Sequence, residues 1–401
     1  MTVFTPAARV ARIKPSPSVA AAARAKELRA AGADLVDMTV GEPDFDTPDF
    51  VKQAGIDAIL AGDTKYTAVN GTPALRKAIR QRMADRTGID YGDDQISVGG
   101  GAKQIIFVAL MASVDNDAEV IIPAPYWVSY PDMVLANEGK PVIVECPEAD
   151  GFKLTPEALE RAITDKTRWL ILNAPSNPTG AAYSDAELTA LAAVLDRHPH
   201  VWVLTDEIYD EIWFEAGRVS SIVRIAPQLA DRTFVVNGVS KTYAMTGWRI
   251  GYGVGPKELT GAINKLQSQM SSCPASMSQA AAAAAMTGDQ SFIAETVAVY
   301  KQRRDIAVKA INAIPELSCT TPSGAFYLYP NCAGVIGKTT PKGEVIERDL
   351  DFVLYLLDSG VAAIHGAAYG LSPHFRISTA TSTELVEEAC RRIAAAVAAL
   401  R

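Results

Sequence analysis

The stretch RWLILNAPSNPTGAAYSDAELTALAAVLDRHPHVWVLTDEIY, residues 168–209, contains two apolar runs with a helical segment between them. The runs RWLILNAP (168–175) and VWVLTDEIY (201–209) are apolar and rich in β-branched residues, as strands buried on both faces are. The segment DAELTALAAVLDRH (185–198) has the pattern of a helix. A strand, a helix and a second strand in this order predict an α/β layer with a mostly parallel sheet.

The same alternation continues on both sides of this unit. Further strands are predicted at 35–40, 95–100, 119–125, 140–146, 233–240 and 249–255, and further helices at 48–62 and 102–113. After about residue 290 the pattern changes to a long helix (291–314), the run GAFYLYP, helices at 349–360 and 382–400, and a strand at 375–379. This part predicts a smaller α+β domain.

Bulk composition excludes several classes of protein. A chain of 401 residues predicts two domains, or one large domain with a smaller one. Its net charge of −8 argues against nucleic acid as the main partner. No apolar run reaches the length of a membrane span, and the first residues lack the apolar core of a secretory signal. The five scattered cysteines have no metal spacing with the four histidines, so we expect free thiols, no metal and a cytoplasmic location.

Several polar residues follow the predicted strands, at the sheet edge where ligands of such folds bind. Gly99, Gly100 and Gly101 precede a helix whose free N–H groups suit a phosphate, although a structural glycine turn explains them equally well. Asp206 and Glu207 end an apolar strand, and one of them should point into this edge and need a positive partner. Taken alone, a helix cap and an exposed acid explain that pair better.

Three more residues fit the same edge. Asn177, in the turn-rich NAPSNPTG, offers an amide, and Trp127 in PAPYWVSY offers a flat ring that stacks on a flat cofactor. Lys241 stands among small residues in NGVSKTYAMTGWRIGY, with Arg249 close behind. Each feature alone is compatible with loop or core packing. Together, a phosphate nest, a buried acid, a stacking ring, an amide and a lysine predict a pyridoxal 5′-phosphate site.

Over nearly its whole length the sequence resembles the class I, fold-type I pyridoxal-phosphate aminotransferases, and within them the bacterial aspartate (aspartate/prephenate) aminotransferase subgroup. The matching stretches are GEPDFDTP, KYTAVNG, PAPYWVSYPDMV, NAPSNPTG, DEIY, SKTYAMTGWRIGY, GAFY and FRIS. The resemblance implies a mostly parallel, seven-stranded type of central sheet with helices on both faces. It also implies a large cofactor-binding domain over 47–290 and a small domain made of 1–46 and 291–401.

The resemblance assigns the cofactor site residue by residue. It implies that Lys241 is the Schiff-base lysine and proton carrier, and that Asp206 pairs with the pyridine nitrogen. Tyr209 and Asn177 would bond the phenolic oxygen, and Trp127 would stack on the ring. Asn177 and Trp127 are expected to contact the substrate as well.

The resemblance also implies an anion site and a shared dimer site. The phosphate contacts are expected from the main chain and side chains of four residues, namely Gly101, Ala102, Lys103 and Arg249. Tyr66 matches a tyrosine that reaches the phosphate of the neighbouring subunit, so a homodimer is expected. Arg376 would clamp the substrate α-carboxylate, and Gly41 would contact the same substrate through its backbone.

Two positions depart from the subgroup's pattern, and one arginine is missing. Ala102 stands where a glycine is expected, and Thr379 where a tyrosine is expected. Residues 266–300, which in better-known aspartate aminotransferases supply an arginine for the side-chain carboxylate, contain none. Lys103 is the expected substitute, and it also contributes to substrate binding.

The implied activity is transfer of the amino group of aspartate to a 2-oxo acid such as 2-oxoglutarate, with glutamate as a further donor toward prephenate. The alternative within the family is an aromatic or other amino-acid aminotransferase. A pyridoxal-phosphate lyase that makes a cyclopropane amino acid is a second alternative. A regulator with a degenerate aminotransferase domain is a third, and it would need a DNA-binding domain ahead of residue 1.

Overall fold

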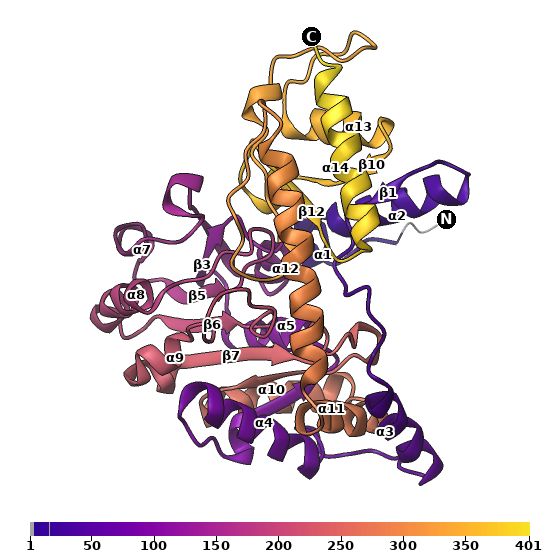
Figure 1. Ribbon diagram of the computed structural model, residues 1–401. Coiled ribbons are helices and arrows are strands. Elements are labelled where there is room, and N and C mark those ends of the chain that lie inside the picture. Colours follow the sequence, from indigo (N-terminus) through magenta and orange to yellow (C-terminus); the bar gives the residue numbers. More distant parts are fainter. Residues whose placement is uncertain (1–3, 16) are drawn as a thin grey trace.

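The computed structural model describes residues 4–15 and 17–401 (Figure 1). Its large sheet has seven strands: β2 (Ile96–Gly99), β3 (Glu119–Ala124), β4 (Lys140–Glu145), β5 (Thr167–Asn173), β6 (Trp202–Asp206), β7 (Thr233–Gly238) and β8 (Gly251–Val254). They lie in the order β2-β8-β7-β6-β5-β3-β4, and β8 alone runs in the opposite direction to the other six. The prediction of a mostly parallel sheet is confirmed, and each strand coincides with a predicted apolar run.

Helices cover both faces of this sheet. One core includes residues of α5 (Ala102–Ser113), α6 (Tyr130–Ala136) and α10 (Lys257–Met270). The other includes residues of α3 (Asp49–Leu60), α4 (Pro73–Thr87), α7 (Pro156–Ala162), α8 (Asp185–Arg197), α9 (Ile222–Ile225) and α11 (Ser276–Thr287). Side chains of one strand alternate between the cores, since Val120 and Ile122 belong to the first and Ile121 to the second. Within the described residues no helix is long and apolar enough to cross a membrane.

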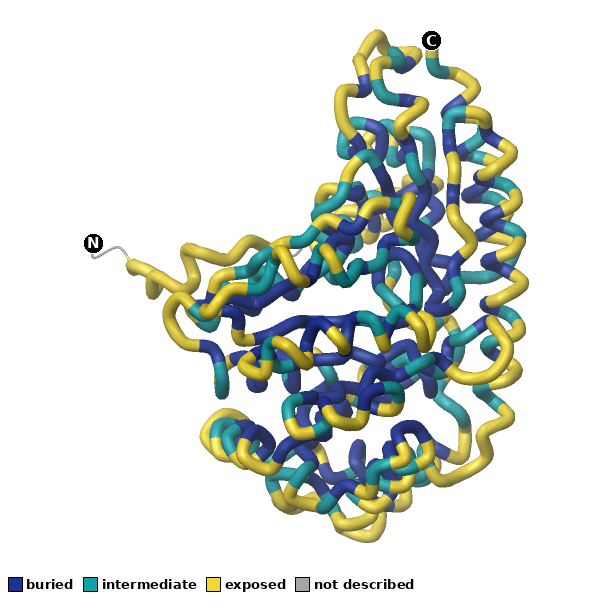
Figure 2. Tube along the Cα trace, turned by 90° about the vertical axis from the view of Figure 1, so that its left-hand side faces the viewer, coloured by how far each residue is buried: buried dark blue, intermediate teal, exposed yellow. Residues whose placement is uncertain are grey.

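The remaining elements form a smaller part, reached by the long helix α12 (Ser291–Asn312) (Figure 1). They are α2 (Pro17–Ala30), β1 (Val36–Asp37), β9 (Tyr327–Leu328), α13 (Asp349–Asp358), β10 (Val361–Ala362), β11 (Ile364–His365), β12 (Phe375–Ser378) and α14 (Thr383–Ala398). The short helix α1 (Ala8–Arg12) lies instead against α6 of the large part. β1 pairs in parallel with β10, so the N-terminal segment joins the C-terminal part. Val36 and Met38 are buried in one core with residues from α12 to α14. Figure 2 shows buried positions along the strands and exposed ones along the outer helices.

The register of the large sheet decides where the polar residues meet. Asn173 at the end of β5 pairs with Asp206 at the end of β6, and Asp206 pairs with Val236 near the end of β7. The carboxyl ends of these three strands therefore lie at one edge. The loops that follow them carry Asn177, Tyr209 and Lys241 to that edge.

Candidate active site

A cavity of about 1140 Å³ lies at this edge, between the large sheet and the smaller part of the chain. Its walls come from α2, residues 39–42, the start of α5, the loops after β5, β6 and β7, and β12. The predicted residues that line it are Gly41, Ala102, Lys103, Trp127, Asn177, Asp206, Tyr209, Lys241, Arg249 and Arg376. Segments far apart in the sequence thus contribute to one site.

Lys241 lies in the turn after β7 and is half-buried. Its Nζ donates a 2.5 Å hydrogen bond to the carbonyl oxygen of Gly41. Burial, together with the cations of Arg249 and Arg376, lowers the pKa of Lys241 to about 8, against the opposing charges of Glu42 and Asp206. A large share of this amine is therefore neutral near pH 8, as a nucleophile or base must be.

Asp206 is buried at the carboxyl end of β6. Its Oδ2 accepts a 2.7 Å hydrogen bond from the phenol of Tyr130, and its Oδ1 accepts one of 3.3 Å from the Ile208 N–H. Burial raises the pKa of Asp206 to about 6, although both hydrogen bonds oppose the rise. Within the described part of the chain the carboxylate forms no ion pair, so it is a ready partner for a cationic ligand atom.

The start of α5 and Arg249 together offer groups that suit an anion. The Arg249 guanidinium donates to the carbonyl oxygens of Gly100, at 3.0 Å, and Thr246, at 2.7 Å. Gly101 has φ of +97°, which favours glycine, and a Cβ there would displace the guanidinium of Arg249 from its position. Helix α5 begins at Ala102, and its first N–H groups point out of the helix end toward the cavity.

Arg376 on β12 is buried and held by two hydrogen bonds. Its Nη1 donates to Asn177 Oδ1 at 3.1 Å, and its Nη2 donates to the Thr39 carbonyl at 2.6 Å. The guanidinium lies 4.5 Å from the ring centre of Tyr327, whose hydroxyl is 2.9 Å from that of Tyr209. Within the described residues Arg376 Nε is buried without a partner, and a bound carboxylate would satisfy it.

Lys103 and Trp127 are adjacent in the cavity wall. Lys103 Nζ lies 4.7 Å from the ring centre of Trp127, as a cation over an aromatic face does. Burial lowers the pKa of Lys103, and the charge of Arg249 adds to the effect. The side chain of Lys103 therefore presents its charge to the cavity.

Tyr66 and Thr379, which were also named from the sequence, lie outside the cavity. Tyr66, between α3 and α4, is 89% exposed and outside the cavity of its own chain. Thr379, at a departure from the subgroup's pattern, is buried and donates from its N–H and Oγ1 to the Phe326 carbonyl, at 2.8 and 3.2 Å. Thr379 thus bonds the main chain and does not line the cavity.

Sequence reasoning missed Tyr130, Asn173 and Tyr327. Tyr327 belongs to the stretch GAFY, which carried the resemblance without a role for its tyrosine, and Tyr130 closes PAPYWVSY. Asn173 lines the cavity as the last residue of β5, and its place at the end of a predicted strand was a signal for it. The partner of Tyr130 lies 76 residues away, so no local pattern identifies that hydrogen bond.

These groups fit pyridoxal 5′-phosphate. The unpaired Asp206 carboxylate matches a protonated ring nitrogen, and the α5 terminus with Arg249 matches a phosphate. Lys241 supplies an amine of lowered pKa in the same cavity. The fold and this site define an enzyme that depends on pyridoxal phosphate.

Comparison with known proteins identifies the family. Residues 33–393 match the family described as aminotransferase class I and II, and the chain belongs to that family. The aspartate aminotransferase of Rhizobium meliloti (strain 1021) is 52% identical over 394 residues, 98% of this chain and 96% of the relative. The aspartate/prephenate aminotransferase of Cereibacter sphaeroides is 51% identical over 392 residues, 98% of each chain.

Solved structures agree in fold. The crystal structure of the aspartate aminotransferase from Rhizobium meliloti superposes with a TM-score of 0.97 at 52% identity and covers 100% of both chains. The aspartate aminotransferase from Thermus thermophilus with maleate gives 0.91 at 38% identity, covering 98% of this chain and 100% of that one. The protein is a pyridoxal-phosphate-dependent transaminase.

Proposed function

We propose that the protein transfers the amino group of aspartate to a 2-oxo acid such as 2-oxoglutarate in two alternating half-reactions, with glutamate as a further donor, including toward prephenate. The observation that carries this proposal is that Arg376 and Lys103, two of the cationic side chains that line the cavity, lie in the same cavity as Lys241. A dicarboxylic amino acid has one carboxylate for each. The names of the relatives from Rhizobium meliloti and Cereibacter sphaeroides support the same substrates.

In this proposal the cofactor is held by the side chains that the cavity brings together. Lys241 binds it covalently, Asp206 holds its ring nitrogen, and Trp127 lies against its ring. Tyr209 and Asn177 hydrogen-bond its phenolic oxygen. When bound, pyridoxal phosphate supplies an electron sink that lets the Cα–H bond of the amino acid break.

The phosphate is assigned to the terminus of α5. The N–H groups of Ala102 and Lys103 and the guanidinium of Arg249 would hold it, with Gly101 leaving the space that Arg249 needs.

Lys241 would also move the proton. The freed Nζ would accept the Cα proton of the amino acid as a base, and would then donate it to the cofactor as an acid. The lowered pKa of Lys241 supports this role, because an amine near pKa 8 exchanges protons readily at neutral pH.

The two carboxylates of the substrate are assigned to different side chains. Arg376, with its planar fork and its free Nε, is assigned to the α-carboxylate, and the Gly41 backbone contacts the same substrate. Lys103 is assigned to the side-chain carboxylate. A lysine acts there as a point charge, so discrimination against neutral side chains should be looser than with an arginine.

The active unit is proposed to be a homodimer with shared sites, in which Tyr66 reaches the phosphate of the partner subunit. Tyr66 is 89% exposed and Leu60 on α3 is 80% exposed in the single chain. Exposure of large apolar side chains is typical of a surface that a partner subunit covers. Arg249 is also exposed in the single chain.

A cytoplasmic location is proposed as well. All five cysteines are free thiols, as is usual in a reducing compartment.

Single-turnover absorbance spectroscopy against a panel of amino acids tests the substrate. Aspartate should convert the bound cofactor with a higher kcat/KM than phenylalanine. Lys103→Met keeps the backbone N–H and most of the stem, so it should lower kcat/KM for aspartate roughly ten- to a hundredfold, the worth of a charged hydrogen bond, and far less for phenylalanine. Equal losses for both donors would limit Lys103 to cofactor binding, and a parental preference for phenylalanine would replace aspartate by an aromatic donor.

A further inference from the structure

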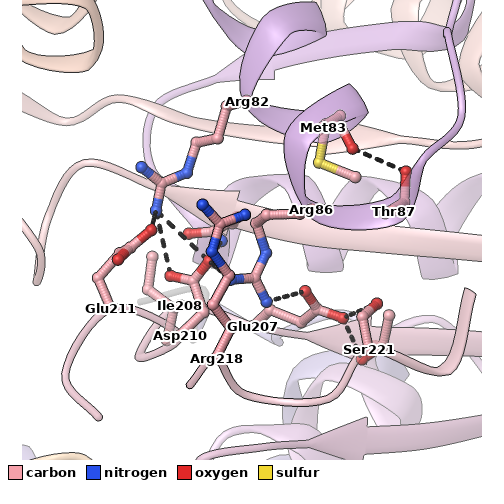
Figure 3. Close-up of polar contacts among 12 residues, drawn as sticks. Arg82, Met83, Arg86, Thr87, Glu207, Ile208, Asp210, Glu211, Arg218 and Ser221 are labelled. Atoms are coloured by element: carbon pink, nitrogen blue, oxygen red, sulfur yellow. Dashed lines mark hydrogen bonds and ion pairs between the residues drawn. The ribbon is translucent and has the colours of Figure 1, made fainter. Parts of the chain in front are cut away.

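A buried charge cluster lies directly behind the candidate active site. It consists of Arg82 and Arg86 of α4 and Glu207, Asp210 and Glu211 of the loop after β6, and we call it the α4 charge cluster (Figure 3). Arg86 bonds Glu207 Oε2 at 3.1 Å and Asp210 Oδ2 at 2.9 Å, while Arg82 bonds Glu211 Oε1 at 2.9 Å. None of the five lines the cavity.

The centre of the cluster is buried, and a contribution to the stability of the fold is not enough to explain why charged residues stand there. Arg86 is 6% exposed, Glu207 2% and Asp210 3%. Removing such charges from water costs nearly as much as their attraction returns, and apolar side chains of the same size stabilise a core equally well. A buried ion pair does impose one geometry on the segments that carry it, because any shift leaves a charge without its partner.

Those segments also carry the cofactor residues. Glu207 and Asp210 alternate along one loop with Asp206 and Tyr209, which line the cavity. Glu207 is fixed further by a 2.7 Å hydrogen bond from the Ser221 hydroxyl.

The cluster reaches the lysine loop too. Asn237, at the end of β7, donates from Nδ2 to Asp210 Oδ2 at 2.9 Å, and Asn237 Oδ1 accepts from the Gly238 N–H at 2.7 Å. Arg82 Nη1 donates to the hydroxyl of Tyr243 at 3.3 Å, two residues after Lys241. The cluster therefore contacts both the segment of Asp206 and Tyr209 and the segment of Lys241, which lie on two sides of the candidate cofactor site.

We propose that Arg86, supported by Arg82, is a positioning residue that holds the loop of Asp206 and Tyr209 and the loop of Lys241 in one fixed relation. This inference rests on the proposed roles of these three residues toward the cofactor. Arg86 acts through Glu207 and Asp210 and touches neither substrate nor cofactor.

The test compares Arg86→Met with Arg232→Met. Arg232 is a matched control because its guanidinium bonds the carbonyls of Leu195, His198 and Val201, all at 2.9 Å, near the opposite ends of β6 and β7. For each protein we would measure three quantities: the free energy of unfolding of the apoprotein in urea, the Kd for pyridoxal phosphate, and the pH midpoint of the visible absorption of the bound cofactor.

Both variants should destabilise the apoprotein, but only Arg86→Met should change the site. Its Kd should rise on the order of tenfold, about 1.4 kcal/mol, and its absorption midpoint should shift. In Arg86→Met/Glu207→Gln the carboxylate of Glu207 is removed together with the arginine that pairs with it, and Asp210 keeps Arg82 at 3.3 Å, so stability should recover in large part while the Kd stays raised. A parental Kd and midpoint in Arg86→Met, or a Kd that recovers with stability in the double variant, would overturn the proposal.

Two further measurements keep the result decisive. If Arg86→Met does not fold, Arg86→Lys keeps the charge and loses the fork, so it should raise the Kd in the same direction by a smaller factor, and an unchanged Kd would refute the proposal. Borohydride labelling of the parent distinguishes a failure of the proposed function from a failure of the positioning role. A parent without label on Lys241 refutes the proposed function, whereas a labelled parent with an unaffected Arg86 variant refutes only the positioning role.

Discussion

Tyr130 donates a 2.7 Å hydrogen bond to the Oδ2 of Asp206, and both side chains are buried. The phenol comes from the first residue of α6 and the carboxylate from the last residue of β6. Burial, with a smaller effect from the charge of Glu207, raises the pKa of Asp206, and the phenol limits this rise because it bonds the ionised form. Tyr130 therefore helps Asp206 to stay ionised, as its proposed role opposite a cationic ring nitrogen requires.

Tyr130→Phe should raise the pKa of Asp206 and lower kcat roughly tenfold or more, since a hydrogen bond to a charged group contributes about 1.5–3 kcal/mol. The acid limb of the pH profile of kcat should move to higher pH. Tyr355→Phe is the control, because the Tyr355 hydroxyl donates 2.9 Å to the Ala396 carbonyl in the smaller part of the chain. An acid limb that stays in place in Tyr130→Phe would refute this role.

Gly101→Ala should weaken cofactor binding by displacing Arg249. The new Cβ would lie 2.4 Å from Arg249 Nη2, and the φ of +97° adds strain of its own. Gly32→Ala separates the two effects, because Gly32 has φ of +90° and no neighbour within 4 Å of the added Cβ. Urea unfolding of the apoproteins should show a loss in both variants, and calorimetry should show a raised Kd for pyridoxal phosphate only in Gly101→Ala. Equal Kd values would remove Arg249 from the phosphate site.

The stability of the apoprotein should depend on pH through Lys241. Its pKa is about 8 in the folded chain, below the ordinary value of 10.5. Between these values the unfolded chain binds more protons at this position, so stability rises with pH across that window. Lys241→Met removes this dependence. Urea unfolding at several pH values should show the parent gaining stability relative to the variant above about pH 8, and a constant difference would contradict the lowered pKa.

Mixed dimers should show whether Tyr66 serves the partner subunit. In a hybrid of one Tyr66→Phe subunit and one Lys241→Ala subunit, one site would keep both Lys241 and Tyr66, while the other would lose both. Purified hybrids should therefore have about half the parental kcat per dimer, with parental cofactor affinity at the active site. Activity and affinity at the level of Tyr66→Phe alone would place the tyrosine in its own subunit's site.

The sequence predicts the large sheet well because its strands are buried on both faces and read as continuous apolar runs. Residues such as Asp206, Asn177 and Lys241 could be placed at one edge because parallel strands end together. The stretch 35–40 also forms a strand, but only over Val36–Asp37, and its partner β10 lies more than 300 residues away, which no local pattern specifies.

Other features depend on pairing across the chain. Arg86 and Glu207 are 121 residues apart, and a basic residue on a polar helix is ordinarily exposed, so their burial together could not be inferred from spacing. The start of helix α4 does have a sequence signal. The Thr72 hydroxyl accepts a hydrogen bond from the Leu75 N–H as an N-cap, and Pro73 is the first residue of the helix. Tyr327 is buried beneath Arg376, a contact that arises only when β9 and β12 pair.

Covalent labelling of the cofactor lysine tests the central claim most directly. The holoenzyme would be reduced with borohydride and digested, and its peptides mapped by mass spectrometry. The account predicts a pyridoxyl-phosphate adduct on Lys241, and no adduct on the neighbouring Lys103. An adduct on another lysine, or none on a protein that retains its cofactor, would contradict the assignment of the site.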